Sequence, residues 1–166
     1  FNQNAVLAKQ FSLNDAALGD DILVGYFATT SDEWSSVDVG MRGDGQFGVV
    51  YNSQSDRTSS LVIRWFSNNG VAEETYELVR SSIEAFVNPK MVMNSDGDMV
   101  MNSDGDTAVA WTSLFGTNQE VQVQLFDNYR KAVGAVATVG DHDYLNRKLA
   151  DLAINRNGSV LLAYTL

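Results

Sequence analysis

A repeated segment constrains the fold of this chain more than any other feature. Residues 39–51, 99–111 and 152–164 each contain alternating apolar residues, then Asp-Gly or Asn-Gly, then a short apolar run. Each run ends on an aromatic residue six positions after the glycine. A pattern that returns along a chain at this spacing predicts an array of similar structural units.

A second repeated segment completes the unit. Residues 61–66 match residues 121–126 and 6–11, and each copy ends on phenylalanine and is followed by a polar turn and another apolar stretch. The two segments together predict units of four β-strands. In the middle of the chain these strands would cover residues 37–41, 46–51, 61–66 and 75–79. The polar turns are expected at residues 12–19, 67–70 and 127–134.

The dipeptides between the strands predict hairpins. Asp44-Gly45 and Asn69-Gly70 lie between apolar runs, and such pairs are typical of two-residue type I′ turns, in which both central residues have positive φ. Alternating apolar residues place one face of each strand in a core. The aromatic residues that recur in register are expected to fill the core between units, and they are Tyr51, Trp111, Tyr164, Phe11, Phe66 and Phe126.

The order of the strands predicts an all-β, propeller-type array. We expect a half-blade at 1–30, a blade at 36–80, a blade at 88–140 and a half-blade at 149–166, since four-stranded units of this length are typical of propeller blades. This makes about three blades, whereas propellers normally need four to eight to close. A second copy could complete the ring by exchanging half-blades, the chain could belong to a longer propeller, or the units could pack as a β-sandwich. We favour the two-copy ring, because unpaired strand edges promote association.

The motif apolar-x-Met-x-x-Asp-Gly-x-Phe at residues 39–47, with the strand at 61–66, resembles a propeller blade repeat of bacterial surface and secreted proteins. It is also similar to the Asp-Gly hairpins of periplasmic propellers. The resemblance implies a β-propeller fold. It does not single out a function, because propellers serve as binding modules, scaffolds and enzymes.

A perfect duplication interrupts the array. Residues 91–98 and 99–106 are identical, and removing one copy makes the spacing of the units nearly equal. We interpret the extra copy as an insertion, and because its length is even it preserves the face on which each side chain lies. Alignment with the other units assigns residues 99–106 to the repeated strand and turn, so that the extra copy is expected at the start of that strand.

The duplicated segment supplies oxygen ligands of the kind that calcium prefers. The weak candidates for a calcium site are Asn94, Asp96, Asp98, Asn102, Asp104 and Asp106. The distal glutamate of a full calcium loop is missing, and a hairpin turn also accounts for Asp-Gly. We therefore expect no cofactor, with calcium as the alternative.

Aromatic residues outside the repeat register are the weak candidates for ligand binding. Tyr26, Trp34 and Phe115 could stack on sugars, as aromatic faces do in lectins, or could pack in the core or at the rim. A glycan or a cell surface is therefore a candidate partner of the chain.

The sequence offers few parts for catalysis. It contains no Gly-x-Ser-x-Gly motif, no glycine-rich phosphate loop and no histidine pair. The single histidine, His142, is expected in a solvated loop. A carboxylate pair for glycoside cleavage could come from Asp32, Glu33, Glu73 or Glu74. We expect no catalytic residues, and a glycoside-active enzyme is the minor alternative.

Composition excludes several partners. A net charge of −10 argues against binding to nucleic acid or to anionic membranes, which require a basic surface. The absence of cysteine excludes disulfides and thiol catalysis. The many small polar residues favour an extracellular, periplasmic or cell-surface location. The sequence thus predicts a non-catalytic binding or assembly module that forms a homodimer, with a lectin-like propeller as the alternative.

Overall fold

The computed structural model describes residues 3–14, 16–28, 36–55, 58–94, 105–139, 147–155 and 157–166. Every regular element in these ranges is a β-strand. The strands are β1 (Gln3–Phe11), β2 (Ala17–Ala28), β3 (Val37–Met41), β4 (Phe47–Ser55), β5 (Thr58–Phe66), β6 (Ala72–Ser81), β7 (Ala85–Met93), β8 (Thr107–Phe115), β9 (Asn118–Phe126), β10 (Ala132–Val139), β11 (Lys148–Ile154) and β12 (Val160–Thr165). The predicted all-β class is confirmed.

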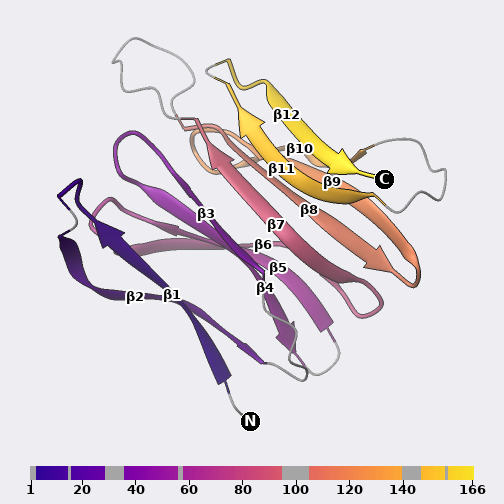
Figure 1. Cartoon of the computed structure of the whole chain (residues 1–166), viewed down its shortest axis with the longest axis horizontal. Coiled ribbons are helices and arrows are strands. Elements are labelled where there is room, and N and C mark those ends of the chain that lie inside the picture. Colours follow the sequence, from indigo (N-terminus) through magenta and orange to yellow (C-terminus); the bar gives the residue numbers. More distant parts are fainter. Residues whose placement is uncertain are drawn as a thin grey trace.

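The strands form four antiparallel sheets in chain order. Strands β3–β4–β5–β6 and β7–β8–β9–β10 make two four-stranded sheets, while β1–β2 and β11–β12 make two-stranded sheets. Each sheet packs against the next, since β2 contacts β4, β3 contacts β7, and β11 contacts both β7 and β8. The two-stranded sheets consequently lie on opposite sides of the molecule (Figure 1).

The apolar pattern located the strands but underestimated their lengths. The predicted strand at 37–41 coincides with β3, whereas β4 and β5 continue beyond the apolar runs to the pair Ser55↔Thr58. Backbone hydrogen bonds of a ladder do not depend on apolar side chains, which explains why polar residues extend the hairpin.

The predicted type I′ turns are wrong. The backbone N–H of Gly45 donates to the carbonyl of Arg42 at 3.0 Å, and the N–H of Arg42 donates to the carbonyl of Gln46 at 2.8 Å. Gly45 has positive φ (85°), but Asp44 does not. This is a three-residue hairpin loop that ends in a left-handed glycine. The same loop joins β5 to β6, where Gly70 donates to Ser67 at 3.0 Å.

The expected turn at 127–134 is also shorter than predicted. It closes between Asp127 and Lys131, and its left-handed residue is Arg130 (φ 64°) instead of Gly134. Gly134 (φ 70°) lies in β10, where the ladder with β9 shifts register. Gly19 likewise lies in β2 and outside the turn that Ser12 closes with Ala16. These glycines allow irregular strand pairing.

The duplication enters the array at a different point from the one expected. The first copy, and not the second, supplies the strand: Met93 on β7 pairs with Thr107 on β8. Asn94 closes the hairpin by donating its N–H to the carbonyl of Asp106 at 2.9 Å, as Arg42 does to Gln46. The insertion therefore lengthens the turn at the end of the strand. Residues 95–104 lie outside the described residues.

Apolar side chains fill the space between successive sheets in three clusters. The central cluster joins the two four-stranded sheets and includes Trp65, Trp111 and Phe126. The second joins β1–β2 to the β3–β6 sheet through Val24, Tyr51 and Phe66, and the third joins the β7–β10 sheet to β11–β12 through Ala108, Leu149 and Leu152. The core of the molecule is thus divided among the joints between sheets.

The recurring aromatic residues do not all share this burial. Tyr51, Trp111, Phe66 and Phe126 are buried as predicted. Tyr164 and Phe11, which occupy the same repeat positions in the two-stranded sheets, are 42% and 64% exposed, so the prediction of a core position is wrong for them in the single chain. Their exposure follows from the missing neighbour: no strand lies beside β12 or on the outer edge of β1 among the described residues.

Candidate functional site

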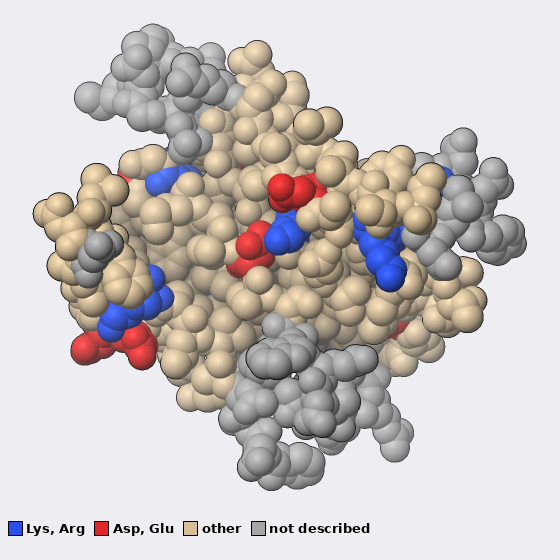
Figure 2. Space-filling model, viewed as in Figure 1, with Lys and Arg blue, Asp and Glu red and all other residues tan. Residues whose placement is uncertain are grey.

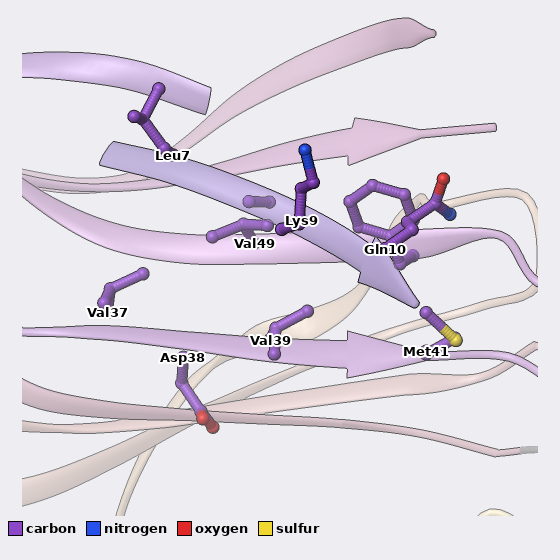
Figure 3. Close-up of a pocket in the computed structure, with 10 residues that line it drawn as sticks. Leu7, Lys9, Gln10, Val37, Asp38, Val39, Met41 and Val49 are labelled. Carbon is purple, nitrogen blue, oxygen red and sulfur yellow. The ribbon is translucent and has the colours of Figure 1, made fainter. Parts of the chain in front are cut away.

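An apolar groove lies between the first two sheets. It has a volume of about 330 Å³ and is open between β1 on one side and β3 and β4 on the other (Figure 3). We call it the β1–β3 groove. It is lined by Leu7, Ala8, Lys9, Gln10, Val37, Asp38, Val39, Met41, Phe47 and Val49.

The pleat of β3 determines which side chains line this groove. Gly40 faces the next sheet, since a Cβ there would lie 2.9 Å from Cγ of Met93. Successive residues of a strand point to opposite faces, so Val37, Val39 and Met41 face away from that sheet and into the groove. Each of these three is at least half exposed, and Val39 is 56% exposed.

The polar groups around the groove are occupied elsewhere. Nζ of Lys9 lies 3.0 Å from the Asp21 carboxylate on β2. The Asp38 carboxylate points away from β1 (Figure 3) and accepts a 2.8 Å hydrogen bond from the backbone N–H of Met91. The Gln10 amide donates to the carbonyl of Asn68 at 3.2 Å. The groove therefore offers mainly apolar contact area, and its charged residues Lys9 and Asp38 have partners within the chain.

Each of the four sheets has two outer edges without a partner strand in the described structure, and the edges of β1 and β12 are the ones that the repeat would continue. Strand β1 pairs with β2 alone, and β12 pairs with β11 alone. Both carry exposed apolar side chains, namely Leu7 and Phe11 on β1, and Leu161 and Tyr164 on β12. An unpaired edge presents backbone donors and acceptors to any strand that approaches it. These edges are therefore sites where another strand could add.

Charged side chains cover only a small part of the face seen in Figure 2. Some acidic and basic side chains lie side by side there, other basic side chains lie apart from any acid, and wide uncharged areas separate them. The ion pairs of the described residues include Arg42 with Asp44 and Arg80 with Glu77.

Side chains tie each four-stranded sheet to the sheet that follows it. Asp38 binds the backbone of Met91, and the Asn52 amide on β4 donates to the carbonyl of Phe86 on β7. At the next joint, Thr112 on β8 accepts a 3.0 Å hydrogen bond from the backbone N–H of Leu149 on β11. Asn52 and Thr112 both directly follow the recurring aromatic residue. The same repeat position thus contacts the following sheet at both joints, as a donor in Asn52 and as an acceptor in Thr112.

A further polar contact between the four-stranded sheets was missed in the sequence. The Arg130 guanidinium donates to the Gln46 amide oxygen at 2.8 Å and to the Glu73 carboxylate at 2.6 Å, and it lies 5.5 Å from the ring centre of Trp65. Arg130 occupies the turn position that Gly70 occupies in the preceding sheet. That replacement of a glycine was the available signal. It also places Glu73, a predicted candidate for glycoside cleavage, in an ion pair with Arg130.

The predicted aromatic ligand residues do not come together. Tyr26 lies on β2 in the first sheet and Phe115 at the end of β8 in the third, each about half exposed. Neither lines the β1–β3 groove. Trp34 lies outside the described residues, as do Asp32, Glu33 and His142.

The predicted calcium ligands are only partly described. Asn94 is buried, and Asp106 is partly buried at the closure of its hairpin. Burial raises the pKa of the Asp106 carboxyl, and the negative charge of Asp127 raises it further. Asp96, Asp98, Asn102 and Asp104 lie outside the described residues. Within the described ranges no three acidic or histidine side chains are grouped to hold a metal ion.

No protein-family model matches the chain, and no curated protein matches its sequence. In the described part of the chain there is no helix of the length and hydropathy needed to span a membrane. The candidate site therefore rests on geometry: an apolar groove and the unpaired edges of β1 and β12.

Proposed function

We propose that this protein is a non-catalytic assembly module of the β-propeller type, whose ring is completed by a second copy of the chain. In this arrangement β11–β12 of one copy and β1–β2 of the other form one four-stranded sheet. The reciprocal contact forms a second such sheet, and the closed ring has a two-fold axis.

One observation carries this proposal. Two aromatic repeat positions that are buried in the four-stranded sheets are exposed in the two-stranded ones: Phe66 is fully buried, but its equivalent Phe11 is 64% exposed, and Trp111 is fully buried, but its equivalent Tyr164 is 42% exposed. Because β1–β2 and β11–β12 correspond to complementary halves of the four-stranded unit, joining them would bury these residues as the complete sheets do. Exposed apolar surface of this kind marks an interaction site.

The groove supports assembly better than catalysis. Its lining is largely aliphatic, and its charged residues already have partners in the same chain. Backbone and aliphatic groups contribute contact area and strand pairing, which suit a protein partner. A glycan or a surface ligand would then bind to the assembled ring of two copies.

The molar mass in solution tests the proposal. The chain has a mass of 18.2 kDa, and light scattering after size exclusion should give twice this value. Dilution of the protein to concentrations below the dissociation constant of the dimer should give the mass of a single chain. A single-chain mass at every concentration, with the sheets intact by circular dichroism, would contradict the proposal.

A further inference from the structure

We infer that the β1–β3 groove is the seat for the β11–β12 hairpin of a second copy, held in one register. The inference rests on the proposed assembly and specifies which surfaces meet. Its basis is internal: the chain shows twice how a hairpin equivalent to β3–β4 docks on the next such hairpin, and both surfaces for another joint of this kind are exposed.

The hairpin turns fix the equivalent positions. The pairs Met41↔Phe47, Met93↔Thr107 and Ile154↔Val160 each adjoin a turn of the same kind. Counting back from these pairs, Val39, Met91 and Leu152 are equivalent on the first strand of each hairpin. Gly48, Ala108 and Leu161 are equivalent on the second.

Side-chain sizes at the joints are complementary. A Cβ on Gly48 would clash with Cε of Met91, so the smallest residue faces a long one. At the next joint Ala108 and Leu152 share a core cluster. On the far face of β11–β12 the equivalent residue is Leu161, which is 72% exposed. The residue it would meet on a second copy is Val39. Leu161 is the largest of the three equivalent residues on the second strands, and Val39 is the smallest of the three on the first strands.

The polar contact of the β3–β7 joint has an unused counterpart on β11, whereas β7 carries Lys90 at the same position. Asp38 of β3 binds the backbone N–H of Met91 in the following sheet. Asp151 holds the equivalent position on β11, is exposed, and binds only its neighbour Leu152, at 2.9 Å, among the contacts described for its side chain. In the proposed seat the Asp151 carboxylate reaches the backbone N–H of Val39 of the second copy. Val39 is the equivalent of Met91.

The internal ladders give the register at the edge. Strands β4 and β5 pair Phe47↔Phe66 and Val50↔Ile63, and β8 and β9 pair Thr107↔Phe126 and Ala110↔Val123. By equivalence, Val160 pairs with Phe11 of the second copy, and Ala163 pairs with Ala8.

Ala163 and Ala8 would form a pair without direct backbone hydrogen bonds. Arg42 and Gln46 are hydrogen-bonded across the β3–β4 hairpin, and bonding alternates along a ladder. Val50 consequently bonds toward β3, which leaves Val50↔Ile63 as a pair without direct hydrogen bonds. Cα atoms in such pairs lie about 4.5 Å apart, a separation that a disulfide can span.

Disulfide trapping tests the register, because the chain has no cysteine of its own. The double variant Ala8→Cys/Ala163→Cys should oxidise to a covalent dimer as its main product, reversible by reductant. The matched control, Ala8→Cys/Leu162→Cys, moves one thiol to the opposite face of β12. It should give at least tenfold less dimer. Circular dichroism of the reduced variants checks that both fold.

A second variant tests the seat without cysteine. Leu161 is exposed on the face of β12 that is proposed to dock, so Leu161→Glu places a charge in the contact. This variant should weaken association at least tenfold. Ile83→Glu, at an exposed apolar residue outside the proposed joint, should leave association unchanged.

The outcomes separate this inference from the proposed function. A native dimer that gives no disulfide in the first variant, or equal disulfide in both, would overturn the seat and its register but leave assembly standing. A monomeric native protein would overturn both. A covalent ladder of longer species would support the pairing and overturn the closed ring of two copies.

Discussion

The carboxylate of Asp38 on β3 accepts a 2.8 Å hydrogen bond from the backbone N–H of Met91 on β7, so that a side chain of one sheet pairs a backbone donor of the next. We expect Asp38→Ala to lower the free energy of unfolding by about 1–3 kcal/mol, since a partly buried donor loses its charged acceptor. Urea denaturation at fixed protein concentration, followed by tryptophan fluorescence, measures the change.

Asp38→Asn is the matched variant at this joint. It keeps an acceptor oxygen at nearly the same size and should lose less stability than Asp38→Ala. Equal stability of the alanine variant and the native protein would show that the hydrogen bond contributes nothing to the joint.

Arg130 adopts positive φ (64°) in the turn between β9 and β10. We predict that Arg130→Gly is more stable than Arg130→Ala by about 1 kcal/mol, because glycine adopts this conformation without the Cβ penalty. Both variants lose the contacts to Gln46 and Glu73, so their difference isolates the backbone effect. Urea denaturation of the pair provides the measurement, and an alanine variant as stable as the glycine variant would refute the prediction.

Asp106 has a raised pKa in the folded chain, caused first by burial and then by the charge of Asp127. The folded state therefore binds this proton more tightly than the unfolded state, and stability falls as the pH rises from the ordinary value of 3.8 through the raised one. Asp106→Asn removes the penalty. It should stabilise the protein at neutral pH by up to about 1 kcal/mol.

The pH dependence of this gain is the check on its cause. The melting temperatures of Asp106→Asn and the native protein should differ at neutral pH and converge below about 3.8, where the carboxyl is protonated in both states. A difference that persists at low pH would point to packing in place of charge.

The duplicated octapeptide lengthens one turn without altering the strands around it. Deleting residues 95–102 joins Asn94 to Ser103 and leaves a loop as long as the one between Arg42 and Gln46. We expect the shortened chain to fold with the same assembly and to gain about 1 kcal/mol, because a shorter loop costs less closure entropy. Thermal unfolding and light scattering measure both properties, and loss of the fold or of the dimer would contradict this.

The sequence predicted the positions of the strands well because their cause is local. The alternation of Val37, Val39 and Met41 defines β3 to its ends. Prediction from the sequence failed where one sequence pattern is compatible with several local structures. Asp44-Gly45 is compatible with a two-residue turn and with a three-residue loop. Either of the two identical octapeptides could supply the strand that pairs with β8. Register with the neighbouring strand decides between such solutions, and register is set by contacts distant in sequence.

The candidate site was the least predictable part. The repeat pointed to half-units and to association, but nothing in the sequence showed that Val39 would line a groove while Asp38, its neighbour, would bind the next sheet. Arg130 was overlooked because its partners Gln46 and Glu73 lie in another unit of the repeat.

The sequence by itself determined the all-β class and the four-strand unit, because hydrophobic periodicity and turn chemistry act over a few residues. Only the tertiary structure decided which copies of a repeated side chain are buried. Phe66 and Phe11 occupy the same repeat position, and one is covered while the other is exposed. Phe66 is covered by Phe47 on the neighbouring strand and by the preceding sheet, and Phe11 has neither in the described part of the single chain, so the same residue forms core in one unit and a binding surface in another.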